Sequence, residues 1–195
     1  GLGGSGGRRD ITEHAHNSKA ERWEDIIRHW MVARTQGGWD KPVNVPLYQS
    51  TRMISAGREC KRIGTWVMVV DTSGSMGDET LQDVLGKIQD AIDTINPRKT
   101  VILPVDWLVR EAYEVTGRGQ VPISLDGGGG TKFQPAFDHI AEYYPDAEGI
   151  VYLTDGWAVD FYDMTEPNIP LLWLTYCKDA EAYPFGDAVD IELYG

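Results

Sequence analysis

The chain has 195 residues, 42% hydrophobic and 25% charged, which is enough for one domain with its own core and argues against wholesale disorder. Its net charge of −12 is unevenly spread: residues 1–64 hold 11 Lys and Arg against 7 Asp and Glu, whereas residues 65–195 hold 7 against 23. The acidic second part disfavours nucleic acid and anionic membranes as partners, and it favours cations and basic protein surfaces.

The sequence shows neither the pattern of a secretory signal peptide nor that of a membrane-spanning segment. The longest apolar runs, residues 66–70 and 169–174, have the length of strands rather than of membrane spans, and no secretory signal peptide is visible. The two cysteines, Cys60 and Cys177, form no metal or redox spacing. These observations favour a cytoplasmic protein with no membrane partner, and they leave the oligomeric state open.

The first 62 residues are predicted to precede the main domain. Residues 1–10 are Gly-rich and typical of a flexible linker, and Gly1 in place of Met indicates a fragment of something longer. Residues 11–33 predict a helix, and residues 39–62, which contain proline, predict an extended arm packed on the main domain. The apolar residues at helical spacing are Trp23, Ile26, Ile27 and Trp30.

The main domain, residues 63–195, alternates apolar strand-length runs with amphipathic stretches. Strands are expected at 65–70, 100–106, 110–116, 149–154, 168–175 and 189–193, and helices at 78–95 and 133–143. This alternation predicts an α/β fold with a doubly wound, mostly parallel sheet flanked by helices, and an N-terminal helical extension. In such sheets ligands bind at the carboxyl ends of the strands.

Three polar loops follow these apolar segments. The first polar loop, residues 71–75, reads D-T-S-G-S, the second, residues 127–131, reads G-G-G-G-T, and the third, residues 154–156, reads T-D-G. Because the carboxyl ends of parallel strands meet at one edge of a sheet, the three loops are expected to converge.

The residue types in these loops suit a hard divalent cation. Ser73, Ser75 and Thr131 offer neutral oxygens as direct ligands, while Asp71 and Asp155 would hold coordinating waters and orient the hydroxyls. Such a set predicts Mg²⁺ or Mn²⁺ with an open coordination position, which a partner carboxylate could fill.

The same residues carry a resemblance to a known family. D-T-S-G-S, with Thr131 and the Asp155 of L-T-D-G, resembles the metal-ion-dependent adhesion site (MIDAS) of von Willebrand factor A (VWA) domains. The runs V-V-D-T-S-G-S-M, G-G-G-G-T-K-F-Q-P, V-Y-L-T-D-G and P-L-L-W-L resemble the VWA-like domain at the C-terminus of bacterial proteins classed with metallopeptidases, over roughly residues 65–180.

The resemblance implies a VWA/Rossmann-like fold and a protein-interaction module that captures a partner carboxylate through its cation. It also implies a partner class, since bacterial VWA proteins are often encoded beside MoxR-family AAA+ ATPases and can act as their adaptors.

The sequence departs from the family pattern in two places. The zinc motif H-E-x-x-H of related proteins is absent, since His14 and His16 are only two residues apart, so peptidase activity is not expected. Lys132 stands where an acidic residue is expected, and a cation there would weaken the local negative field.

Simpler interpretations of the loops remain open. The first polar loop could be only a strand-to-helix turn, because Asp and Ser are common there. The second could be a plain turn or an anion nest, although the phosphate-loop pattern is not matched, since Thr131 precedes Lys132. A structural domain with a vestigial site is the corresponding alternative function.

An enzymatic function is the alternative to a protein-interaction module. A metal-assisted hydrolase would need a general base, for which only Asp71, Asp155 and Asp126 are candidates. Ser75 lies in a near match to the nucleophile elbow, yet His139 is the sole histidine after it and falls inside a predicted helix. Asp71 as a phosphoryl acceptor is a further possibility.

Trp157 directly follows Asp155-Gly156 and is a candidate partner-binding residue at the rim of the site. Burial in the core is the equally open alternative for this side chain.

Overall fold

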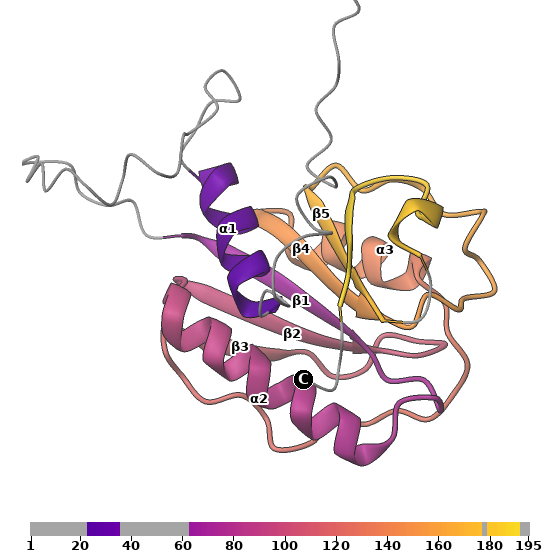
Figure 1. The fold of residues 1–195 in the computed structure, drawn as a ribbon, viewed down its shortest axis with the longest axis horizontal. Helices are drawn as coiled ribbons and strands as arrows, with labels where there is room; N and C mark the ends of the chain where they lie inside the picture. The colour runs from indigo at the N-terminus through magenta and orange to yellow at the C-terminus, as the bar shows by residue number, and fades with distance from the viewer. Residues whose placement is uncertain (1–22, 36–62, 177–178, 192–195) are drawn as a thin grey trace, which may run out of the picture.

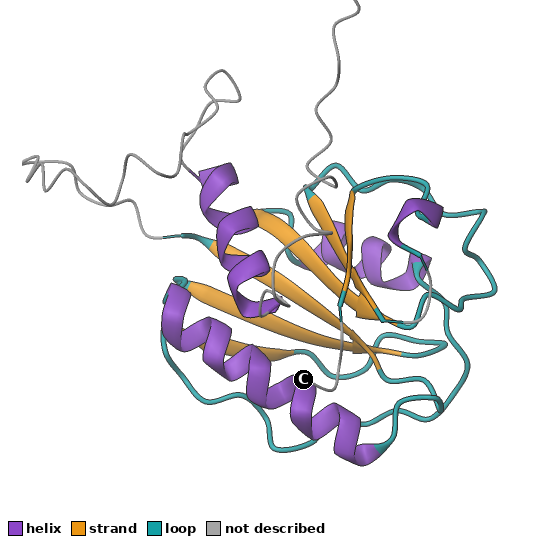
Figure 2. Cartoon of the chain, viewed as in Figure 1, coloured by secondary structure: helices purple, strands orange, loops and turns teal. Residues whose placement is uncertain are grey.

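A six-stranded mixed sheet forms the centre of the computed structural model, which describes residues 23–35, 63–176 and 179–191 (Figures 1 and 2). The strand order is β3-β2-β1-β4-β5-β6. The strands are β1 Thr65–Asp71, β2 Lys99–Val105, β3 Tyr113–Thr116, β4 Ala147–Thr154, β5 Leu171–Thr175 and β6 Asp187–Asp190. The helices are α1 Trp23–Thr35, α2 Asp78–Ile95 and α3 Gln134–Tyr143, with a short 3-10 helix, η3, at Ala180–Ala182.

The pairing confirms the predicted mostly parallel, doubly wound sheet. β1 lies between β2 and β4 and is parallel to both, and β4–β5 and β5–β6 are parallel as well. Only β3 is antiparallel among the described strands, and it pairs with β2 along the outer edge. β1 therefore has a hydrogen-bonded strand along each edge. All of its residues are also buried, which agrees with its continuous apolar sequence.

Each face of the sheet is covered by helices. Alternate strand residues point to opposite faces, so that Trp66 and Met68 pack with α1 and α2, while Val67 and Val69 pack with α3. Figure 1 shows α1 and α2 in front of the sheet and α3 behind it. Asp71 continues the series of Val67 and Val69, so its side chain belongs to the face that α3 covers.

The expected helix within residues 11–33 is described from Trp23 to Thr35, and it packs on the domain. Ile27 and Met31 are buried in the core that α1 shares with α2. Trp30 meets Trp66 edge-on, with ring centroids 5.5 Å apart, and its Nε1 donates to Asp187 Oδ2 at 2.6 Å. The N-terminal helix thus touches both β1 and the segment that begins β6.

Some predicted boundaries were wrong for local reasons. The strand expected from residue 110 begins at Tyr113, because Arg110 N still donates to Pro104 O and closes the turn after β2. β5 begins at Leu171, directly after Pro170, rather than at 168. β6 covers Asp187–Asp190 and so begins two residues before the predicted 189, while residues 192–193 of the predicted strand lie outside the described residues; η3 was not predicted.

Other predictions lie outside the described residues. These are the linker at 1–10, the arm at 39–62, His14, His16 and both cysteines. Within the described ranges, no helix combines the length and apolar character needed to cross a membrane.

Candidate metal centre

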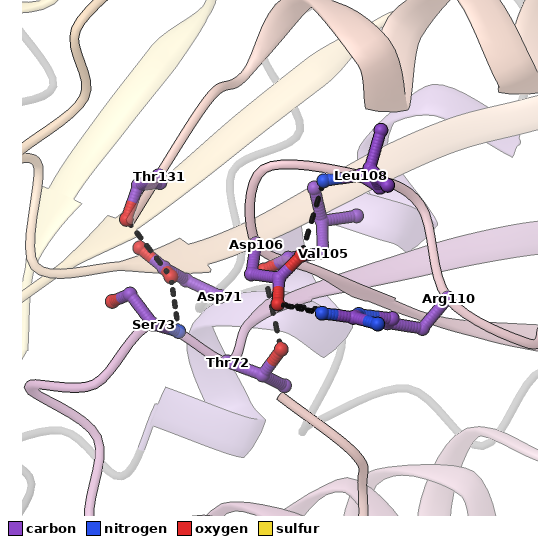
Figure 3. A network of polar contacts seen from close by, with 8 residues as sticks. All are labelled: Asp71, Thr72, Ser73, Val105, Asp106, Leu108, Arg110 and Thr131. Atoms are coloured by element: carbon purple, nitrogen blue, oxygen red, sulfur yellow. Dashed lines mark hydrogen bonds and ion pairs between the residues drawn. The ribbon is translucent and has the colours of Figure 1, made fainter. Parts of the chain in front are cut away.

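Asp71 ends β1 with a carboxylate that has no exposed surface. Its Oδ1 accepts a hydrogen bond from the backbone N of Ser73 at 2.9 Å, which folds the chain back immediately after the strand (Figure 3). The hydroxyl of Thr131 approaches the same Oδ1 at 3.4 Å, and Thr154 Oγ1 donates to Oδ2 at 2.7 Å. One buried carboxylate therefore gathers all three polar loops around itself.

The surroundings of Asp71 have opposing effects on its pKa. Burial raises the pKa because it disfavours the charged form, and the neighbouring Asp155 raises it further. The hydrogen bonds from Thr154 and Ser73 lower it, but the net direction is upward from the ordinary value of 3.8. Desolvation thus outweighs the hydrogen bonds, and a cation nearby would offset that cost.

Two serines extend this network towards solvent. Ser73 Oγ and Ser75 Oγ lie 3.0 Å apart, and Ser75 Oγ donates to Asp155 Oδ2 at 2.7 Å. Ser73 is buried whereas Ser75 is exposed, so the network runs from the interior to the surface. The structure brings together all five residues of the predicted set: Asp71, Ser73, Ser75, Thr131 and Asp155.

The glycines of the second polar loop allow it to lie directly on the first. Gly74 N donates to Gly129 O at 3.1 Å, and Gly128 N donates to Thr72 O at 2.8 Å. A Cβ on Gly127 would stand 2.3 Å from Thr72 O, and Gly128 has φ +124°, which side-chain-bearing residues rarely adopt. The glycine run is therefore a requirement of close packing between two backbones rather than a plain flexible turn.

The segment after the third polar loop fastens Thr131 in place. Val159 N donates to Thr131 O at 3.2 Å. The carboxylate of Asp160 accepts hydrogen bonds from Phe133 N and Gln134 N at 2.9–3.1 Å, and so caps α3, which has no side-chain cap of its own. The sequence placed Thr154 in the third polar loop without predicting its bond to Asp71, and it gave no indication of the role of Asp160, because neither residue has a spacing that marks its distant partner.

Asp106 directly follows β2 beside the site, but it belongs to an ion pair of its own. Its carboxylate accepts hydrogen bonds from Arg110, with Nε at 3.2 Å, and from Leu108 N at 3.0 Å (Figure 3). Burial would raise its pKa, yet these hydrogen bonds and the charge of Arg110 lower it below 3.8. Asp106 thereby shapes the turn after β2 and is not linked to Asp71 by any hydrogen bond found among the described residues.

Lys132 stands where the family pattern has an acidic residue, so the position of its ammonium bears on the predicted metal site. Its Nζ lies 5.0 Å from the ring centroid of Trp107, in a cation–π contact, and its backbone N donates to Asp106 O at 3.1 Å. The ammonium thus lies over an indole that is itself packed against Gly129 and Gly130 of the second polar loop.

The remaining candidates separate clearly. Trp157 is 67% exposed, so it lies at the surface, and its N donates to Asp155 Oδ1 at 3.0 Å. His139 lies on α3 and stacks on Tyr143, with ring centroids 4.5 Å apart. Across the described residues, no three His, Cys, Asp or Glu side chains are grouped to share an ion, so a cation here would depend on hydroxyl oxygens.

The donor set fits a small hard cation better than a soft one. It consists of three hydroxyls and two carboxylates from three loops, without thiol or imidazole. Ser75 gives this arrangement an exposed end at the surface.

Comparisons with known proteins bear on the family and the fold of the chain. The family described as VWA-like domain (DUF2201) matches residues 66–192. An uncharacterized protein of Thermotoga maritima is 25% identical over 160 residues, which cover 78% of this chain and 37% of that protein. The crystal structure of the ArnB paralog VWA2 from Sulfolobus acidocaldarius is 21% identical, with a TM-score of 0.52 over 62% of this chain and 37% of that one. The second likeness concerns the fold, and the chain spans little more than a third of either relative.

Proposed function

The chain belongs to the family of VWA-like domains, and on that premise we propose that it is a metal-dependent protein-interaction module. In this proposal the module holds Mg²⁺ or Mn²⁺ at the three polar loops and binds a carboxylate of a partner protein there. The observation that carries the proposal is the single hydrogen-bonded network that joins five side chains of three separate loops.

Each residue has a role that follows from its position. Ser73, Ser75 and Thr131 would ligate the ion directly, since hydroxyl oxygens leave a hard cation electrophilic. Asp71 and Asp155 would balance its charge and orient the hydroxyls, because they already accept hydrogen bonds from this set. The bound ion would accept the oxygen of a partner carboxylate at an open coordination position, and the three loops would fix the direction in which that position faces.

The burial of Asp71 supports a holding role rather than a catalytic one. Both of its oxygens are engaged by Ser73 N and by the hydroxyls of Thr131 and Thr154. A general base needs access to the proton it removes, and a carboxylate without exposed surface lacks it. The metal-assisted hydrolase therefore stands as the second candidate, without an observation that favours it.

The partner class in this proposal is a MoxR-family AAA+ ATPase, for which the module would act as an adaptor. Its support is the family resemblance together with the acidic balance of residues 65–195, which suits a basic partner surface.

Calorimetric titration with Mg²⁺ and Mn²⁺ tests the proposal. Wild type is expected to bind one ion, and Asp71→Asn is expected to lose at least tenfold in affinity, because the neutral amide cannot balance the ion's charge. Asp138→Asn is the matched control, since Asp138 is exposed on α3 and bonds only Gln134 Nε2 among the interactions described.

Absence of cation binding by wild type would contradict the proposal and favour a structural domain. Turnover of phosphoester or peptide substrates that disappears in Asp71→Asn would favour the hydrolase instead. Retention of a MoxR-family ATPase on the immobilised module only when Mg²⁺ is present would support the adaptor role.

A further inference from the structure

Exposed apolar side chains are concentrated beside the proposed metal site. Among the described residues, eight large hydrophobic side chains are exposed, and five of them lie in the two segments that follow β2 and β4. These five are Trp107, Leu108, Trp157, Val159 and Tyr162. Scattered exposed hydrophobics are ordinary on soluble proteins, but a group gathered at one edge marks an interaction site.

The strand order places these two segments on opposite sides of the first polar loop. β1 lies between β2 and β4 and is parallel to both. The chain therefore leaves all three strands at the same edge, with residues 107–108 on one side of Ser73 and Ser75 and residues 157–159 on the other. We name the four side chains Trp107, Leu108, Trp157 and Val159 the apolar rim.

The site holds the indole of Trp107 and the backbone of Trp157 in position. Trp107 lies against the second polar loop so closely that a Cβ on Gly129 or Gly130 would stand 2.6–2.8 Å from its ring. Trp157 N donates to Asp155 Oδ1, while the other oxygen of that carboxylate accepts from Ser75. Preformed aromatic side chains lose little conformational entropy when a partner covers them.

Charge indicates what lies between the two sides of the rim. The carboxylates of Asp71 and Asp155 would balance a divalent ion, and Lys132, which directly follows Thr131 and contacts Trp107, adds one positive charge after the second polar loop. The complement to this pattern is one carboxylate at the centre with apolar side chains around it.

We propose that the apolar rim selects a partner loop in which an Asp or Glu is flanked on both sides by apolar side chains. This inference rests on the proposed function, because the carboxylate is the group that the bound ion receives. Trp107 and Leu108 cover one flanking side chain, and Trp157 and Val159 cover the other. The rim thereby supplies the selectivity that a cation, which accepts any carboxylate, does not provide.

Short peptides test this inference on the Mg²⁺-saturated protein. The probes are acetyl-Leu-Asp-Leu-amide, acetyl-Gly-Asp-Gly-amide and acetyl-Leu-Asn-Leu-amide, titrated while the indole N–H signals are followed by NMR. The leucine-flanked aspartate is expected to bind about fivefold more tightly than the glycine-flanked one, because two leucines are partly buried. The asparagine peptide is expected to bind far more weakly than either.

Variants assign the preference to the rim. Trp157→Ala and Leu108→Ala are each expected to reduce the preference for leucine flanks, because each removes part of one side of the rim. Both should leave Mg²⁺ affinity unchanged, because neither side chain belongs to the network of ligands. Tyr143→Ala is the matched control, since this exposed aromatic residue ends α3 at the opposite edge of the sheet.

The outcomes separate the inference from the proposed function. Equal affinity for the two aspartate peptides, with Mg²⁺ bound, would overturn the rim inference alone. Equal binding of the asparagine peptide would overturn both the rim inference and the carboxylate capture of the proposed function, since it would show apolar adhesion without a carboxylate. Loss of both Mg²⁺ binding and peptide binding in wild type would overturn the proposed function and the inference together.

Discussion

Asp71 ends β1 and Asp106 directly follows the neighbouring β2, yet their surroundings shift the two pKa values in opposite directions. Asp71 has hydrogen bonds but no cationic side chain among its described partners, and its pKa is raised by burial. Asp106 likewise has no exposed surface, but Arg110 and Leu108 N hold its pKa below the ordinary value. Asp106 therefore has a cationic partner in Arg110, whereas no cationic side chain is paired with Asp71 among the described residues.

The Asp106–Arg110 pair predicts a dependence of stability on pH. Because the folded-state pKa of Asp106 lies below 3.8, the unfolded chain takes up its proton first as the pH falls. The stabilisation by the pair is therefore fully present well above pH 3.8 and is lost as the pH falls through the folded-state pKa.

Arg110→Met is expected to be less stable than wild type at about pH 6, and the difference should narrow towards about pH 3. Urea unfolding at several pH values measures it. Arg118→Met is the control, because Arg118 donates to the carbonyl of Asp93 rather than to a carboxylate. A difference that stays constant over this range would contradict the assignment.

At the scale of elements, the site depends on how one loop fastens another. Thr131 immediately precedes the turn into α3, and the start of that helix is capped by Asp160 from the segment after β4. Val159 N holds the carbonyl of Thr131 in the same region. The position of one proposed ligand is thus set by a segment of the chain that follows it by almost thirty residues.

Asp160→Ala is expected to lower the free energy of unfolding by about 1 kcal/mol, the usual cost of losing an N-terminal cap. It is also expected to weaken Mg²⁺ binding, because the cap holds the segment that carries Thr131. Urea unfolding and calorimetric titration measure the two effects.

Asp160→Asn should largely restore both properties, since an amide oxygen also caps helices well. If Asp160→Ala lost stability but kept full Mg²⁺ affinity, the cap would be structural only and would not position Thr131.

At the scale of the whole molecule, α1 extends the domain beyond the family match. The family matches residues 66–192, whereas Ile27 and Met31 of α1 are buried in the core shared with α2. Trp30 adds contacts to Trp66 and Asp187. The folded unit accordingly includes a helix that lies thirty residues before β1.

Ile27→Ala is expected to lower the free energy of unfolding of the whole domain by about 2–5 kcal/mol, because it leaves a cavity in a fully buried position. Urea unfolding followed by circular dichroism and by tryptophan fluorescence measures it, and the two transitions should coincide. His29→Ala, at an exposed position of the same helix, should change little. An early separate transition in Ile27→Ala would show that α1 folds apart from the sheet.

The sequence alone predicted the fold class and the five residues of the candidate site. Period-two and helical apolar patterns reflect burial on the two faces of the sheet, and that burial is a property of each element by itself. Asp71, Ser73 and Ser75 stand at alternate positions after a buried strand, and parallel strands bring Thr131 and Asp155 to the same edge. The predictions from sequence were wrong at strand ends, as at Tyr113 and Leu171, where a turn or a proline decides the boundary.

Only the tertiary structure decided which side chains serve the others. Thr154 bonds Asp71, Asp160 caps a distant helix, and Lys132 rests on Trp107, and each contact depends on the angle at which loops meet. The exposure of Trp157, left open by the sequence, was decided in the same way, because exposure depends on all neighbouring segments at once. Local patterns encode which residues are buried within an element, whereas contacts between loops arise only when the sheet has brought their strands together.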